Sequence, residues 1–123
     1  MPTDDPTPPQ PSPTGGAGPT VQVLHIEECP NWAEAGAMIR RALDAAGHAE
    51  VDVEYVVLQT RTEAAAVAFA GSPTILVDGV DLFPGRRTDD LACRVYRTDR
   101  GLAGLPTQDQ VDEAIRTRLR PTS

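Results

Sequence analysis

The stretch from Val21 to Trp32 constrains the fold more than any other part of this 123-residue chain. It opens with a mostly apolar, β-branched run (residues 21–26), which is typical of a strand covered on both faces. The acidic pair Glu27-Glu28 ends the run, and Cys29 and Pro30 follow. Proline is favoured at the first position of a helix, because the N–H that it lacks would have no partner there. The sequence therefore predicts that Cys29 lies at a strand-to-helix junction.

A cysteine at such a junction is expected to be reactive. The unpaired N–H groups at a helix N-terminus, and the positive end of the helix dipole, favour the thiolate form. The negative charges of Glu27 and Glu28 oppose this effect. The alternative interpretation is a buried and inert thiol, because free cysteine is among the most buried residue types. His25, within the strand, is expected to be packed and hydrogen-bonded locally rather than to act as a base toward Cys29.

Composition divides the chain into an arm and one domain. Residues 1–19 hold seven of the twelve prolines and almost no apolar side chains, which predicts a disordered, partly polyproline-like arm. The arm lacks the basic start and the apolar centre of a secretory signal. Residues 20–123 are long enough for a single small α/β domain.

Charge and cysteine usage narrow the class of partner. The formal net charge of −7 argues against a nucleic-acid partner, and no apolar run is long enough to cross a membrane. Two cysteines without an export signal favour reduced thiols in the cytoplasm over a disulfide framework. We therefore expect catalytic, metal-binding or redox roles for Cys29 and Cys93.

The remaining elements follow from periodicity and turn signals. Residues 30–46 predict a helix, whose apolar stripe includes Trp32 either as core or as a shield for the thiol, and Gly47 ends it. Residues 51–58 predict a second strand, parallel to the first. Further expected elements are a short helix after the capping box Thr60–Glu63, a β-hairpin around Asp78-Gly79, a short helix over residues 89–96, a loop over 101–106 and a final helix after the capping box Thr107–Gln110.

This order of elements resembles the thioredoxin-like superfamily over about residues 21–119. The resemblance depends on two motifs: Cys29-Pro30-Asn31-Trp32, where the family has Cys-x-x-Cys, and Ser72-Pro73-Thr74, which matches its cis-proline element. It implies an α/β fold, a three-layer α/β/α sandwich whose central mixed sheet has about four strands and whose helices number three or four. It also implies that Ser72, Pro73 and Thr74, with Trp32, shape a substrate surface beside the cysteine.

One departure from the family pattern bears on the chemistry. The family's second cysteine falls on Trp32, so dithiol exchange within the motif is impossible. Cys29 could then act alone through mixed disulfides, Cys93 could be a distant resolving thiol, or the two thiols could bind a soft metal. Arg94 and Arg97 are expected to favour the thiolate of Cys93.

The first hypothesis is a thiol-dependent oxidoreductase that needs no cofactor. Cys29 would be the nucleophile and Cys93 the resolving thiol, acting on a thiol or disulfide substrate, either a protein or a small molecule. The alternatives are a binding module without turnover and a dithiol that handles a soft metal or an organomercurial. The last is suggested by a resemblance to small bacterial thioredoxin-like proteins that sometimes carry an organomercurial-lyase label.

Overall fold

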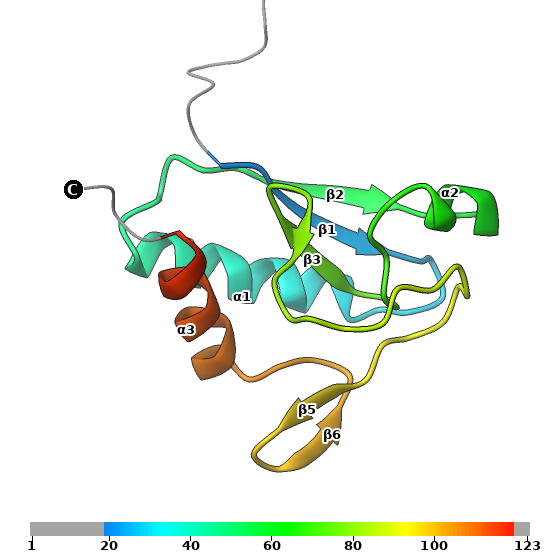
Figure 1. The fold of residues 1–123 in the computed structure, drawn as a ribbon. Coiled ribbons are helices and arrows are strands. Elements are labelled where there is room, and N and C mark those ends of the chain that lie inside the picture. Colours follow the sequence, from blue (N-terminus) through cyan, green and yellow to red (C-terminus); the bar gives the residue numbers. More distant parts are fainter. Residues whose placement is uncertain (1–18, 120–123) are drawn as a thin grey trace, which may run out of the picture.

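A computed structural model describes residues 19–119 of the chain. The arm expected at residues 1–19 therefore lies outside the described residues, except for Pro19. In chain order the elements are β1 (Val21–His25), α1 (Trp32–Ala45), β2 (Val53–Val57), α2 (Arg61–Ala65), β3 (Thr74–Val77), β4 (Val80–Asp81), β5 (Tyr96–Thr98), β6 (Gly101–Ala103) and α3 (Gln108–Arg118), as Figure 1 shows.

A four-stranded mixed sheet forms the centre of the fold, with strand order β2-β1-β3-β4. The strand β1 runs parallel to β2, as the strand–helix–strand order predicted, and antiparallel to β3. The hairpin of β3 and β4 turns at Asp78 and Gly79, whose φ angles of 53° and 80° are those that a tight two-residue hairpin requires. The expected mixed α/β class, with about four strands in the sheet and three helices in the described residues, is confirmed.

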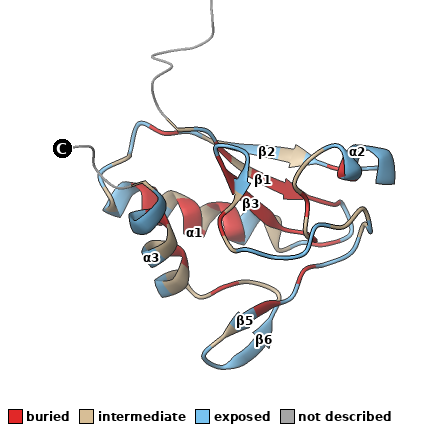
Figure 2. Ribbon diagram, in the orientation of Figure 1, coloured by how far each residue is buried: buried red, intermediate tan, exposed pale blue. Residues whose placement is uncertain are grey.

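The two central strands of the sheet are β1 and β3, and Figure 2 shows both as buried. Their side chains alternate between two apolar clusters. One cluster joins Val21 and Ile75 to α1 and α3, through residues such as Ile39 and Ile115. The other cluster lies on the opposite face, and α2 with the turn after it contributes to it. Its buried members are Leu24, Ile26, Cys29, Leu58, Ala64, Phe69 and Leu76. Cys29 is thus part of the second core.

The helix boundaries follow the predicted signals, with one correction at α1. Both capping boxes, at Thr60 and at Thr107, are present, and Gly47 takes a φ of 85° just after α1. The helix α1, however, has Asn31 as its N-cap and begins at Trp32. Pro30 is therefore not the first helical residue, and Cys29 lies three positions before the helix. This weakens the expected influence of the helix dipole, which falls off within about one turn.

The region after β4 was predicted incorrectly. Residues 89–96 form no helix, and Gly101–Ala103 is not a loop but the strand β6, which pairs with β5 in a projecting antiparallel hairpin. The physical reason is tertiary. The backbone around residue 93 bonds to Ser72 instead of to itself, so it is extended. No helix within residues 19–119 has the length and apolar character needed to cross a bilayer.

Candidate functional site

The two cysteines, far apart in the sequence, meet in the structure. Cys29 follows β1, and Cys93 lies on the segment that leads to β5. They approach each other to 2.6 Å, and both are free thiols. This separation lies between the S–S bond of about 2.05 Å in a disulfide and the van der Waals contact of two sulfur atoms, so the two thiols are held close to bonding distance. The fold therefore builds a pair of adjacent thiols from residues that no local motif connects.

Ser72 holds the two cysteines together. Its backbone N–H donates to the carbonyl of Ala92 at 2.9 Å, and its carbonyl accepts from the N–H of Arg94 at 2.8 Å. Ser72 and Cys93 thus form an isolated β-bridge. The same carbonyl accepts a hydrogen bond from Sγ of Cys29 at 3.5 Å, and the Ser72 hydroxyl accepts from the N–H of Ile26 at 3.0 Å.

The peptide bond between Ser72 and Pro73 is cis, as the resemblance implied. Thr74 supports this turn, since its hydroxyl donates to the Gly71 carbonyl and accepts from the N–H of Ala70 at 3.0 Å. Ser72, Pro73 and Thr74 are buried. The structure therefore brings Cys29, Cys93 and Ser72 into contact, with the cis-proline turn directly adjoining them.

Arg94 fixes the position of Cys93, its neighbour in the chain. The Arg94 guanidinium is buried, bonds to both carboxylate oxygens of Asp81 at 3.2 and 3.0 Å, and donates to the carbonyl of Phe83. It also lies 4.5 Å from the centre of the Tyr96 ring, and the Tyr96 hydroxyl donates to the Pro73 carbonyl. These contacts tie the segment on both sides of Cys93 to the sheet and to the cis-proline turn. Removing one partner of such a buried pair typically costs about 3–5 kcal/mol.

Gly71 allows the close approach of this segment. Its φ is 105°, a conformation that side-chain-bearing residues rarely adopt. A Cβ atom at this position would lie 2.8 Å from the Arg94 Cβ and 3.0 Å from its Cα. Only glycine fits here without displacing the residue that follows Cys93.

The two thiols differ in their access to solvent. Cys29 has no exposed surface, whereas Cys93 is exposed. An external disulfide that meets the folded protein therefore reaches Cys93 first. Cys29 is buried, as the alternative interpretation of the sequence expected. It is not isolated, however, because it lies beside the thiol of Cys93.

Electrostatics around Cys93 differ from the sequence-based expectation. The pKa of Cys93 is raised above its ordinary value, first because its thiol hydrogen-bonds with Cys29, then through partial desolvation and through electrostatic contributions from Cys29 and Glu28. Arg94 was expected to favour the Cys93 thiolate, but its charge pairs with Asp81 instead. Burial in turn raises the pKa of Asp81, although Arg94 opposes that shift.

Trp32 takes part in an aromatic cluster. Its ring stacks on His25, with centroids 4.6 Å apart, and meets the edge of Tyr55 at 5.4 Å. His25 is buried, and its Nδ1 lies 3.4 Å from the Ile26 carbonyl oxygen, which agrees with the packed and locally bonded role expected for it. Trp32 is half-buried and belongs to neither apolar cluster, so these contacts do not decide between a core residue and a shield for the thiol.

Two residues of this site, Asp81 and Tyr96, were missed by sequence reasoning, and Arg94 was expected to act on the Cys93 thiolate rather than to pair with Asp81. Their importance comes from long-range contacts, which no local motif encodes. A signal was available at Gly71, because a glycine before Ser-Pro-Thr is consistent with a positive φ at a turn. Within residues 19–119 no group of three or more His, Cys, Asp or Glu side chains could hold a metal ion, so the two thiols have no third ligand there.

Comparisons with known proteins leave the family unassigned. No protein-family model matches the chain, and neither a curated protein nor a solved structure was found to match it. The geometry of the two thiols is therefore the feature that bears on function.

Proposed function

We propose that this protein carries out thiol–disulfide exchange with the Cys29–Cys93 pair, on a fold of the thioredoxin-like type. The observation that carries the proposal is the contact of the two free thiols beside the cis Ser72–Pro73 bond. The thioredoxin-like, three-layer interpretation is supported by the β1-α1-β2 unit with parallel strands, and by apolar clusters on both faces of the sheet. It is also supported by a cis-proline directly before β3.

The exchange takes place in two steps. The Cys93 thiolate attacks one sulfur of an external disulfide, which forms a mixed disulfide and releases the first thiolate. Cys29, after losing its proton, attacks the Cys93 sulfur, which forms the Cys29–Cys93 bond and releases the second thiolate. The two protons lost by the cysteines end on the two released thiols, and the protein loses two electrons. A second dithiol of any source restores the reduced pair by the reverse steps.

Exposure assigns the roles in this proposal, and it reverses those expected from the sequence. Cys93 meets the substrate because its thiol is exposed, and Cys29 resolves from the interior because its thiol is not. The proposed site of action is a reducing compartment, namely the cytoplasm, because cysteine pairs are kept reduced there.

The test uses the full chain and dithiodipyridine, an uncharged disulfide whose released thiol absorbs light. The reduced wild type should release two equivalents per chain and lose the mass of two hydrogens. Cys29→Ser should release one equivalent and retain a mixed disulfide on Cys93. Cys93→Ser should release none while it remains folded, because Cys29 is buried.

Two results would contradict the proposal. One is a wild type that stops at one equivalent with a stable mixed disulfide, which would indicate a protein that captures thiols without turnover. The other is a folded Cys93→Ser variant that reacts as fast as the wild type, which would mean that Cys29 alone performs the chemistry. Circular dichroism of each variant verifies that the comparison is made between folded proteins.

A further inference from the structure

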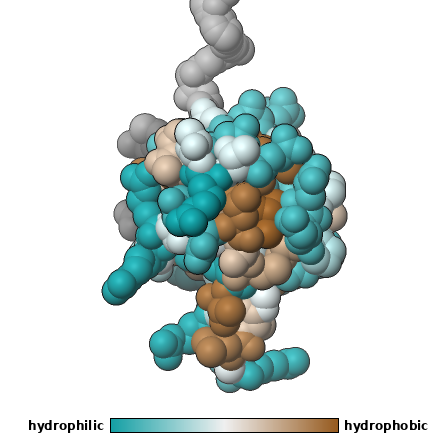
Figure 3. All heavy atoms as spheres, turned by 90° about the vertical axis from the view of Figure 1, so that its right-hand side faces the viewer, coloured by the Kyte–Doolittle hydropathy of each residue, from teal (hydrophilic) through white to brown (hydrophobic). Residues whose placement is uncertain are grey.

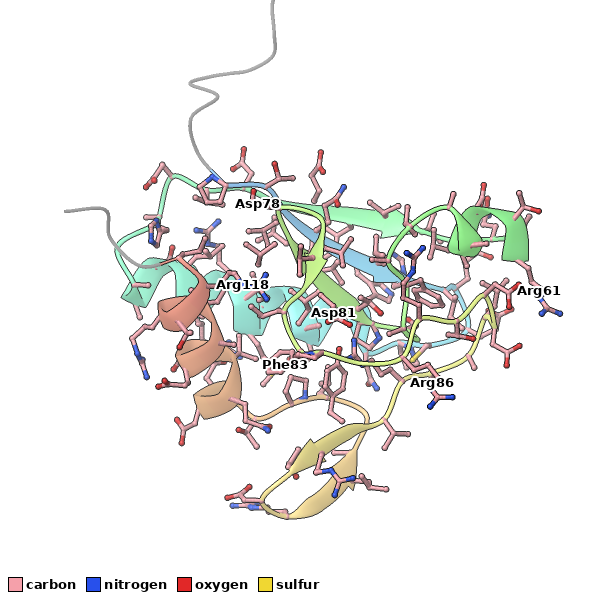
Figure 4. The ribbon with its side chains drawn as sticks, in the orientation of Figure 1. Arg61, Asp78, Asp81, Phe83, Arg86 and Arg118 are labelled. Atoms are coloured by element: carbon pink, nitrogen blue, oxygen red, sulfur yellow. The ribbon has the colours of Figure 1, made fainter. Side chains whose placement is uncertain are left out.

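Cys93 lies in the wall of a cavity that the exchange reaction does not by itself require. The cavity has a volume of about 630 Å³ and lies along the segment from Phe83 to Arg97. Figure 4 shows Phe83 and Arg86 on the part of this segment that passes between the sheet and the β5–β6 hairpin. The volume is within the range of about 300–1,000 Å³ that is usual for small-molecule pockets.

The charge of this wall contrasts with that of the whole protein. The chain carries a formal charge of −7, yet Arg86, Arg94 and Arg97 line the cavity and Asp90 is the one acid among the lining residues. Arg94 is paired with Asp81. In the part of the chain that the structure describes, no ion pair or side-chain hydrogen bond is formed by Arg86 or Arg97. Two guanidinium groups are therefore available to an anion beside an exposed thiol.

The cavity also has apolar walls. Phe83, Tyr96 and Val95 line it, and 60% of Val95 is exposed. Figure 3 views the adjoining end of the molecule, where apolar surface lies between hydrophilic flanks and continues onto the projecting hairpin. Such a wall can accommodate the carbon skeleton of a small ligand whose charged groups reach the arginines.

The backbone beside the cysteines argues against an extended peptide as the occupant. A peptide that pairs as a strand with the cis-proline turn needs the N–H and the carbonyl of Ser72. Both groups are already bonded, to Ala92 and Arg94 of the chain itself. A small molecule entering from the cavity side reaches Cys93 without breaking these bonds.

We propose that the cavity bounded by Arg86, Arg97 and Cys93 is the binding site for a small disulfide that carries carboxylate groups. This inference rests on the proposed function and adds the class of substrate to it. The carboxylates bind Arg86 and Arg97, which presents a sulfur of the ligand to the Cys93 thiolate. Attack breaks the ligand's S–S bond, joins one half to Cys93 and releases the other half as a thiolate, after which Cys29 resolves the product as above.

The test compares two chromogenic disulfides that differ in charge, dianionic dithiobis-nitrobenzoate and uncharged dithiodipyridine. The full-length reduced protein is used as wild type, as Arg86→Gln/Arg97→Gln, and as Arg100→Gln. Arg100 is a matched control: it is exposed at the tip of the hairpin, has no side-chain bond in the described residues, and does not line the cavity. We expect the double variant to react roughly five- to tenfold more slowly with the dianion, because it loses two charge contacts, each of the strength usual for an exposed ion pair. Its rate with dithiodipyridine should not change, and Arg100→Gln should change neither rate by more than about twofold.

A binding measurement separates this inference from the exchange chemistry. In the Cys29→Ser/Cys93→Ser variant the dianionic disulfide cannot react, and its binding is followed by shifts of backbone amide signals. The shifts should map to residues 83–97, and they should be lost when Arg86 and Arg97 are also replaced. A rate with the dianionic disulfide that is the same in the wild type and the double variant, or amide shifts elsewhere, would overturn the cavity assignment even if two equivalents of thiol are released. Release of only one equivalent would instead overturn the exchange proposal.

Discussion

Oxidation of the Cys29–Cys93 pair should stabilise the folded protein strongly. The bond would close a loop of roughly 64 residues, and the loss of chain entropy in the unfolded state then corresponds to about 4 kcal/mol. The two thiols are already adjacent in the reduced protein, so the backbone should not have to move far to form the bond. By linkage, the fold should make this disulfide harder to reduce than in the unfolded chain, by roughly 85 mV for a two-electron couple.

Urea denaturation of the oxidised and the reduced protein measures this difference. At an m-value of about 1–2 kcal/mol per molar urea, the midpoint of the oxidised form should lie roughly 2–4 M higher. Cys93→Ser, which cannot form the bond, should show one midpoint under both conditions. Coincident midpoints for oxidised and reduced wild type, with the disulfide verified by mass, would refute the inference that the fold places the thiols ready to bond.

Three further predictions test how the Cys93 segment is held. Cys29→Ser removes the main cause of the raised pKa of Cys93, so this pKa should fall. The alkylation rate of Cys93 should then rise at a lower pH than in the wild type, and an unchanged pH profile would contradict this cause. Arg94→Met leaves the Asp81 carboxylate without its partner, so the free energy of unfolding in urea titrations should fall by about 3–5 kcal/mol. A loss below about 1 kcal/mol would refute the role assigned to the Arg94–Asp81 pair. Gly71→Ala should destabilise more than Gly79→Ala, because both have a positive φ but only Gly71 meets a neighbour; equal losses would mean that the contact is unimportant.

The sequence determined the local structure of the fold. The strand before Cys29, the two capping boxes, the Asp78-Gly79 turn and the glycine stop at Gly47 all depend on interactions within a few residues, and all were predicted. The parallel pairing of β1 and β2 followed as well, because a strand–helix–strand unit has a fixed handedness. The candidate cysteines and the Ser72–Pro73 turn were also chosen from the sequence.

Only the tertiary structure decided how these parts meet. That Cys93 contacts Cys29, that Cys29 is the buried partner, and that Arg94 pairs with Asp81 all depend on contacts between distant segments. The same contacts changed the expected helix at residues 89–96 into an extended segment, since bonds to Ser72 replaced those within a helix. Local periodicity carries no information on such pairing, because the free energy that selects it comes from burial and hydrogen bonds between residues far apart in the chain.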